Sequence, residues 1–196
     1  MAPWKSLSAL SLLLAGGPLA VPARAQAPAP APPTTAEVKK DVPYVPTPQA
    51  VVDRMIALAE VKEGDLVYDL GCGDGRIVIA AVKKPGVRGV CVDIDPARIA
   101  ESRTNAEAAG VSNHIRFVEG DIFTIPFADA TVVTMYLLPS VNMRLRPRLL
   151  NELRPGTRIV SHAFDLGDWK AEQQVVEQGS MIYRWTVPPR AEGAGR

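Results

Sequence analysis

Short apolar runs separated by polar or glycine-rich stretches recur along this chain from residue 49 onward. Residues 49–59 place apolar side chains three or four positions apart, which predicts an amphipathic helix. Runs rich in β-branched residues predict strands at 66–70, 87–95, 115–118, 131–138 and 157–164. Helical patterns at 77–82, 97–109 and 145–153 fall between some of these strands. The alternation predicts an α/β fold with a parallel sheet.

The end of the chain has a different pattern. Two strand-like segments, 173–177 and 181–187, flank Gln178-Gly179-Ser180, which predicts a β-hairpin. Added to the five parallel strands, the hairpin gives a doubly wound, Rossmann-like sheet of seven strands with an antiparallel edge. A ligand of such a sheet is expected beyond the carboxyl ends of its strands.

Capping residues refine the helix boundaries. Thr47 is expected to N-cap the helix at 49–59, with Pro48 as the first helical residue. Asp95 precedes Pro96 and is expected to cap the helix at 97–109, which Gly110 ends. Pro147 is expected at or near the start of the helix at 145–153.

A glycine-rich turn follows the first strand. Gly71, Gly73 and Gly75 are spaced Gly-x-Gly-x-Gly, one residue tighter than the dinucleotide fingerprint. Asp69, two residues before the first glycine, would repel a pyrophosphate but suits the ammonium of an amino acid. The pattern resembles motif I of the class I S-adenosylmethionine-dependent methyltransferases. A glycine-rich turn without a ligand is the alternative.

Two later acids fit the same family. Asp93 lies 20 residues after Gly73 at the end of a strand, a position suited to ribose hydroxyls. The resemblance implies that Asp121 contacts the adenine amino group and that Ile122 packs on the ring. S-adenosyl-L-methionine is therefore the expected cofactor, and no metal is expected.

Two tyrosines are the expected acceptor-site residues. Tyr136 ends the fourth strand, where this class of enzyme delivers the methyl group, and the segment is not of the Asn-Pro-Pro-Tyr type. Tyr44 lies on a proline-braced loop that either crosses the site mouth or merely packs as a strap. We expect both tyrosines to position the acceptor without a dedicated general base. His162 is interpreted as a core histidine, with a proton acceptor as the alternative.

The Tyr44-Val45-Pro46-Thr47-Pro48 loop and the following Asp-Leu-Gly-x-Gly-Asp-Gly-Arg motif narrow the resemblance. Together they are similar to the family of lysine methyltransferases that act on mitochondrial ATP synthase and on the adenine nucleotide translocase. That resemblance implies N-methylation of a protein lysine. A small-molecule methyltransferase and an exported domain that binds cofactor without turnover are the alternatives.

The N-terminus predicts export. Lys5, the apolar run 7–15 and Ala23-Arg24-Ala25 form a signal peptide over residues 1–25, with Gln26 as the new N-terminus. Residues 26–40 are expected to be an Ala/Pro tether, 41–189 the methyltransferase domain and 190–196 a disordered tail. Because the cofactor is made in the cytoplasm, either it reaches the exported protein, or export is wrong, or the fold serves another use.

The composition of the chain says little about which partner the protein binds. A net charge of +1 over 196 residues gives no sign of nucleic acid, and the apolar N-terminal run is too short to span a membrane. We expect a monomer. Cys72 and Cys91 are expected as two buried thiols, with a disulfide as the alternative. Arg144, Arg146, Arg148 and Arg154 are expected to form a solvated face, with docking of an acidic partner as the alternative.

Overall fold

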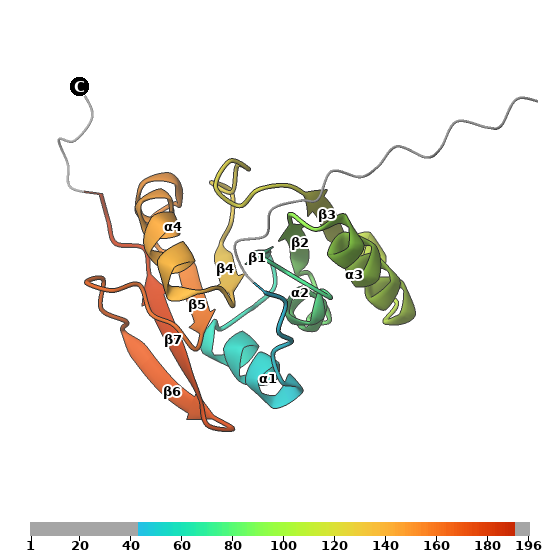
Figure 1. Ribbon diagram of the computed structural model, residues 1–196, viewed down its shortest axis with the longest axis horizontal. Helices are drawn as coiled ribbons and strands as arrows, with labels where there is room; N and C mark the ends of the chain where they lie inside the picture. The colour runs from blue at the N-terminus through green and yellow to red at the C-terminus, as the bar shows by residue number, and fades with distance from the viewer. Residues whose placement is uncertain (1–42, 191–196) are drawn as a thin grey trace, which may run out of the picture. The chain divides into compact units, whose positions relative to one another are not determined.

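Seven hydrogen-bonded strands form one sheet in the computed structural model, which describes residues 43–190 (Figure 1). The strands lie in the order β3-β2-β1-β4-β5-β7-β6. Strands β1 to β5 pair in parallel, while β7 pairs antiparallel with β5 and β6. Their bounds are Leu66–Leu70 (β1), Arg88–Asp93 (β2), Ile115–Glu119 (β3), Val132–Met135 (β4), Arg158–His162 (β5), Gln173–Glu177 (β6) and Ser180–Thr186 (β7). The predicted doubly wound sheet with an antiparallel edge is confirmed.

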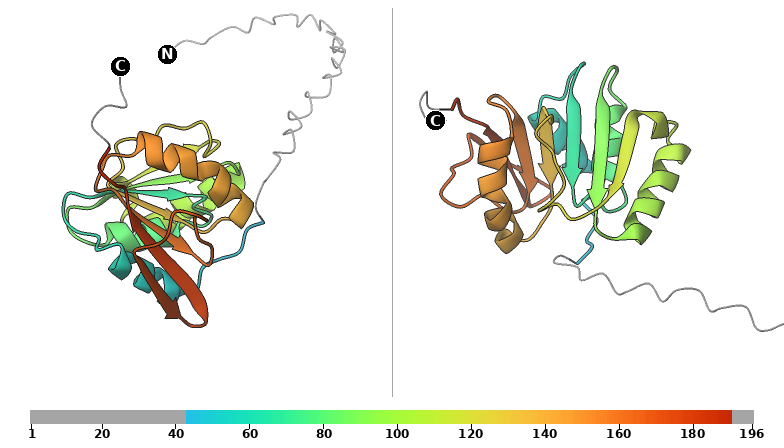
Figure 2. Two further views of the ribbon diagram at one scale, coloured as in Figure 1. Left: turned by 90° about the vertical axis from the view of Figure 1, so that its left-hand side faces the viewer. Right: turned by 90° about the horizontal axis from the view of Figure 1, so that it is seen from above.

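Helices cover both faces of the sheet. Three of them, α1, α2 and α3, contribute to one apolar core, and α4 contributes to a second core on the opposite face together with Phe127 and Trp185. Figure 2 shows the strands between these helices. The helices are Gln49–Leu58 (α1), Arg76–Val82 (α2), Pro96–Ala108 (α3) and Pro139–Glu152 (α4), with a 3-10 turn at Ser112–His114. No helix within residues 43–190 is long and apolar enough to cross a membrane.

The strand order reverses between β1 and β4. From β1 the chain winds outward through β2 to β3, then returns to β4 and winds the other way to β5. The loops that leave β1 and β4 therefore diverge at the same end of the sheet. Such a switch point is where α/β proteins bind ligands.

The C-terminal hairpin turns through two residues with positive φ. Gln178 has φ 49° and Gly179 has φ 77°, between the paired residues Glu177 and Ser180. Two consecutive positive φ angles indicate a type I′ turn, whose twist matches that of the flanking strands. The predicted hairpin is confirmed, and its second strand begins at Ser180, inside the predicted turn.

Two predictions about helix starts were wrong. Pro48, not Thr47, is the N-cap of α1, and no side-chain cap bond forms there. The Thr47 hydroxyl instead contacts Nδ1 of His162 at 3.1 Å. α4 begins at Pro139 rather than near Pro147, which lies inside the helix on its exposed face. Pro147 removes one backbone hydrogen bond of the helix, at a place where both Pro147 and Met143 are exposed.

A buried ion pair ties α1 to the sheet at the end opposite the switch point. Arg158 pairs with Asp65, and its Nη1 also donates to the carbonyls of Ala59 and Glu60 just after α1. Because Asp65 and Arg158 are nearly inaccessible to solvent, each depends on the other for compensation of its charge. The end of α1 is therefore fixed to β5. The expected signal peptide and tether (residues 1–40) lie outside the described residues. So does the expected tail at 190–196 apart from Arg190, which is hydrogen-bonded to the carbonyls of Asn151 and Leu153.

Candidate active site

A cavity of about 170 Å³ opens at the switch point. Its walls are the glycine loop after β1, the ends of β2 and β4, the segment after β3 and residues 43–47, which we call the strap. Of the predicted site residues, those on the cavity wall are Tyr44, Gly71, Gly73, Asp93, Asp121, Ile122 and Tyr136. The structure thus brings seven of the nine predicted residues together, and Asp69 and Gly75 do not reach the wall.

Glycine is needed in the loop for different reasons at different positions. A Cβ on Gly71 would lie 2.8 Å from Leu137 Cδ2, and one on Gly73 would lie 2.6 Å from a ring carbon of Tyr44. Both residues have positive φ and face the cavity. A Cβ on Gly75 would instead meet Ser102 of α3 at 2.9 Å. Gly75 therefore permits close packing of α2 and α3 rather than contact with a ligand.

The backbone amides of the loop are already engaged. Gly71 N and Cys72 N both donate to the carbonyl of Val92 at 2.9 Å, and Gly73 N donates to Asp93 Oδ2 at the same distance. A phosphate cradle needs free amides directed at the anion. This loop is therefore tied to β2 and is poorly suited to a pyrophosphate.

A disulfide joins Cys72 of the glycine loop to Cys91 of β2. The prediction of two separate buried thiols was wrong. The sequence signal was weak because the pair is 19 residues apart and only the parallel pairing of β1 with β2 brings the two positions together. The bridge adds a covalent link to the backbone bonds between the loop and β2.

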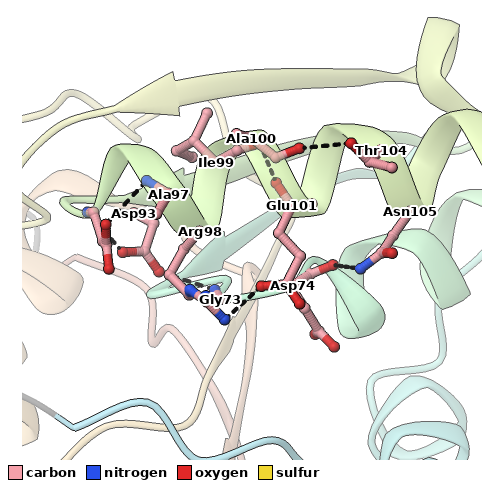
Figure 3. A network of polar contacts seen from close by, with 12 residues as sticks. Gly73, Asp74, Asp93, Ala97, Arg98, Ile99, Ala100, Glu101, Thr104 and Asn105 are labelled. Carbon is pink, nitrogen blue, oxygen red and sulfur yellow. Dashed lines mark hydrogen bonds and ion pairs between the residues drawn. The ribbon is translucent and has the colours of Figure 1, made fainter.

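Asp93 lines the cavity with both carboxylate oxygens accepting backbone hydrogen bonds, from Gly73 N and from Asp95 N at 2.9 Å (Figure 3). Each carboxylate oxygen has a second lone pair, so capacity for ribose hydroxyls remains. Asp95 Oδ1 accepts from Ala97 N at 3.0 Å, which confirms the predicted cap of α3. From α3, Asn105 Nδ2 also reaches the carbonyl of Asp74 at 2.9 Å.

Asp69 lies beneath the cavity and is 1% exposed. Thr134 Oγ1 donates to its Oδ1 at 2.8 Å, whereas Oδ2 is buried without a hydrogen-bond partner. Burial raises the pKa of Asp69 to about 7, against the lowering effect of the Thr134 bond. An unpaired buried carboxylate oxygen at this place is suited to a cationic or donating group.

Asp121 and Ile122 follow β3 and lie on the opposite wall from the strap residues. Asp121 Oδ1 accepts from Phe123 N at 2.8 Å, which turns the chain into the cavity. Arg148 of α4 fixes the same turn from outside by donating to the carbonyls of Ile122 and Ile125. Arg148 therefore braces this wall instead of forming part of a solvated face.

Tyr136 and His162 form the far end of the site. Their rings are in contact, with centroids 3.9 Å apart and planes tilted by 35°, and of the two only Tyr136 lines the cavity. His162 is 3% exposed, and burial lowers the pKa of its imidazole. With Thr47 Oγ1 as its partner, His162 is the satisfied core histidine that the sequence predicted.

The strap places Tyr44 over the glycine loop. Its ring packs against Gly73, the Asp74 carboxylate lies close enough to act on its hydroxyl electrostatically, and the guanidinium of Arg98 stacks on it 4.6 Å from the ring centroid. Burial and the charge of Asp74 raise the pKa of Tyr44. Burial also acts to raise the pKa of Asp74, but hydrogen bonds from Arg76 outweigh it and hold that pKa below its usual value. The strap crosses the mouth, which was one of the two predicted alternatives.

Three charged wall residues were missed by the sequence analysis: Asp74, Arg76 and Arg98. Asp74 and Arg76 belong to the Gly-Asp-Gly-Arg end of the glycine motif, so their position in the motif was a usable signal. Arg98 carried no signal, because its contact with Tyr44 depends on how the strap crosses α3.

The wall residues fit the expected cofactor. The glycine cradle leaves no room for Cβ atoms, Asp93 retains acceptor capacity, and Asp69 offers an unpaired oxygen near the loop. Within the described part of the chain no group of three or more His, Cys, Asp or Glu side chains is arranged to hold a metal ion.

Comparison with known proteins agrees with this geometry. The model of the ANTKMT methyltransferase domain matches residues 69–173. A protein-lysine N-methyltransferase from Saccharolobus islandicus is 49% identical over 151 residues, 74% of this chain and 94% of the relative. The adenine nucleotide translocase lysine N-methyltransferase of Mus musculus is 32% identical over 151 residues, 76% of this chain and 65% of the relative, so the match spans just under two thirds of the mouse protein.

Among solved structures, an RNA methyltransferase from Salinibacter ruber in complex with S-adenosyl-L-homocysteine is 52% identical, with a TM-score of 0.73. The match covers 76% of this chain and 97% of that protein. The glycine cradle, the acids at the strand ends and these matches lead to one conclusion: the chain belongs to the ANTKMT methyltransferase domain family and is a methyltransferase of Rossmann-like fold.

Proposed function

We propose that this methyltransferase uses S-adenosyl-L-methionine to N-methylate the lysine side chain of a protein. The observation that carries the proposal is the charge of the cavity. Four carboxylates line it, on Asp74, Asp93, Asp95 and Asp121, against two guanidinium groups, on Arg76 and Arg98. An acidic cavity attracts an amine acceptor and a cationic cofactor.

We assign the cofactor contacts as follows. Asp93 binds the ribose hydroxyls, Asp121 and Ile122 hold the adenine, and Gly71 and Gly73 let the amino-acid moiety approach the backbone. Asp69 compensates the ammonium from beneath the loop. Gly75 is not assigned a cofactor contact: it has a left-handed φ of 80° before α2 and allows α2 and α3 to pack.

The cofactor supplies an activated sulfonium methyl group, so the protein needs to position the acceptor and exclude water. Tyr44 and Tyr136 line the same cavity. Their rings would hold the lysine stem. A partly enclosed site disfavours the charged form of the amine and so lowers its pKa. Neutral amine is the form that attacks the methyl group.

RNA is the second candidate acceptor, because the Salinibacter ruber protein is described as an RNA methyltransferase. The acidic cavity disfavours RNA as the acceptor, because proteins that bind nucleic acid gain much of their affinity from basic groups that neutralise phosphates. A small-molecule acceptor and binding without turnover are further outcomes of the same test.

The test is transfer of radiolabelled methyl groups to cell extract, with matched samples treated with protease or ribonuclease. We expect label in protein, sensitive to protease alone, and N-methyl-lysine on acid hydrolysis. The Asp93→Ala variant is the control for cofactor-dependent labelling. Label in RNA, label in the low-mass fraction, or cofactor binding without any transfer would each overturn the lysine proposal.

We further propose that the protein acts outside the cytoplasm as a monomer. The signal-peptide pattern at residues 1–25 supports export, and the Cys72–Cys91 bridge supports an oxidising compartment. Mass spectrometry of the protein from fractionated cells tests this. An N-terminus at Gln26 in the exported fraction is expected, and an intact N-terminus in the cytoplasm contradicts it.

A further inference from the structure

Tyr44 and Tyr136, the two tyrosines proposed to hold the acceptor, form what we call the acceptor mouth. A chain of polar contacts through neighbouring residues connects them. It runs from His162 through Thr47, Arg76 and Asp74 to Tyr44. The His162 ring packs against the Tyr136 ring, so the chain begins at one tyrosine and ends at the other. We propose that Thr47 and Arg76 are positioning residues that fix the spacing between Tyr44 and Tyr136.

Arg76 is the central link. Its Nη1 donates to the carbonyl of Thr47 at 2.7 Å, while Nε and Nη2 grip both oxygens of Asp74 at 2.6 to 3.0 Å. A planar guanidinium makes these bonds in one fixed geometry, which a lysine ammonium does not reproduce. Arg76 therefore sets the distance between the strap and the start of α2.

Thr47 is held twice. Arg76 binds its carbonyl, and His162 contacts its hydroxyl at 3.1 Å, so the residue is 3% exposed although it follows four exposed strap residues. The two bonds come from different parts of the fold, since Arg76 opens α2 and His162 ends β5. Thr47 is consequently the point at which the strap is anchored.

The anchor restrains Tyr44 together with the contacts of its ring with Gly73 and Arg98. Tyr44 and Val45 are 45% and 54% exposed, so burial contributes little to their position. Pro43 and Pro46 restrict the backbone angles of the strap, which transmits the position of Thr47 three residues upstream. At its end, Tyr44 is held by Asp74, which Arg76 also holds.

The inference rests on the proposed function for the identity of the acceptor, but not for the position of the strap. Two variants break the chain of contacts at different residues. Arg76→Lys keeps the positive charge but loses the paired guanidinium hydrogen bonds. Thr47→Val loses only the hydroxyl. We expect each to lower kcat by about tenfold, the equivalent of one or two hydrogen bonds. Affinity for S-adenosyl-L-homocysteine should change by less than about threefold, because neither residue was assigned a cofactor contact.

NMR relaxation gives a readout that needs no acceptor. Backbone order parameters of Tyr44, Val45 and Thr47 should be lower in Arg76→Lys and Thr47→Val than in wild type, in protein saturated with S-adenosyl-L-homocysteine. If wild type methylates no lysine, the proposed function fails while the order parameters still test the anchor. Thr47→Ser retains a hydroxyl and should restore both the order parameters and turnover.

Arg103→Lys and Thr104→Val are matched controls, because both residues are exposed on α3 outside the chain of contacts. Unchanged order parameters and unchanged kcat in both test variants would overturn the proposal. A parallel loss of kcat and cofactor affinity would also overturn it, since the chain would then hold the cofactor. Should Arg76→Lys fail to fold, Thr47→Val with its Thr47→Ser rescue decides the question.

Discussion

The imidazole of His162 packs against the ring of Tyr136 at a tilt of 35° with their centroids 3.9 Å apart, and only the tyrosine reaches the cavity. This geometry makes the histidine a support for the tyrosine. Since burial lowers the pKa of His162, the ring is neutral at neutral pH and needs no counter-charge.

His162→Gln therefore tests base catalysis. Glutamine keeps a hydrogen-bonding group for Thr47 but cannot take up a proton, and we expect turnover within about tenfold of wild type. Loss of a general base typically costs about a hundredfold or more. Single-turnover rates with saturating cofactor measure the difference. If His162→Gln lowered turnover by about a hundredfold or more while cofactor binding stayed intact, His162 would be the general base and the positioning mechanism would be wrong.

Tyr136→Phe and Tyr44→Ala test the acceptor mouth. Each should lower kcat by about tenfold, because a lost orienting contact is worth about 1 kcal/mol or slightly more. Affinity for S-adenosyl-L-homocysteine, measured by calorimetry, should fall much less. Tyr183→Phe is a control outside the cavity. Equal losses in kcat and cofactor affinity would contradict the assignment of these rings to the acceptor.

Asp93 and its neighbour Asp95 have separable roles. Asp93→Ala should weaken cofactor binding at least about tenfold, since charge-assisted hydrogen bonds are worth about 1.5–3 kcal/mol each. Asp95→Ala should cost about 1 kcal/mol of stability through loss of the α3 cap. Calorimetric titration and urea unfolding distinguish the two effects. Equal cofactor affinity of Asp93→Ala and wild type would refute the ribose assignment.

Asp69 makes stability depend on pH. Its pKa of about 7 in the folded protein exceeds the usual value of an aspartate, so the folded state binds more protons than the unfolded state. Stability should therefore fall as pH rises from about 4 to about 7, by at most about 1.4 kcal/mol per pH unit. Asp69→Asn should flatten this dependence in urea unfolding at pH 5 and pH 8. The exposed Asp53→Asn serves as the control, and an unchanged slope in Asp69→Asn would be the contrary result.

The Cys72–Cys91 bridge should contribute to stability mainly by restricting the unfolded chain. For a sequence separation of 19 residues, the Cys72→Ser/Cys91→Ser double variant should lose about 3 kcal/mol. Urea unfolding of the oxidised wild type, the reduced wild type and the double variant measures this. Reduced wild type should match the double variant; identical unfolding of all three would show that the bridge contributes nothing.

Much of this architecture could be predicted from local patterns. The strands, the Asp95 cap, the hairpin and the spacing from Gly73 to Asp93 each depend on residues close in sequence. The pairing of parallel strands then follows from the alternation of elements. These features predict a ligand site at the end of the sheet where the structure has its cavity, without knowledge of any long-range contact.

Contacts between segments far apart in the sequence could not be predicted from local patterns. Thr47 was predicted to cap α1 because local rules favour it, but a bond to His162, 115 residues away, prevails. The disulfide depends on strand register, and the burial of Asp69 depends on β4 lying beside β1. Arg148 resembles a surface charge until the segment after β3 folds against α4. Each miss is a tertiary contact that overrides a local preference.

The route of the strap also bears on how the enzyme is handled in the laboratory. Any tag, fusion partner or surface tether attached through the residues before Pro43 is joined directly to the segment that carries Tyr44. Arg190 instead binds the carbonyls of Asn151 and Leu153, at the end of α4 remote from the cavity. An affinity tag or an immobilising linker is therefore better placed after Arg190, where it leaves access to the methyl-transfer site open.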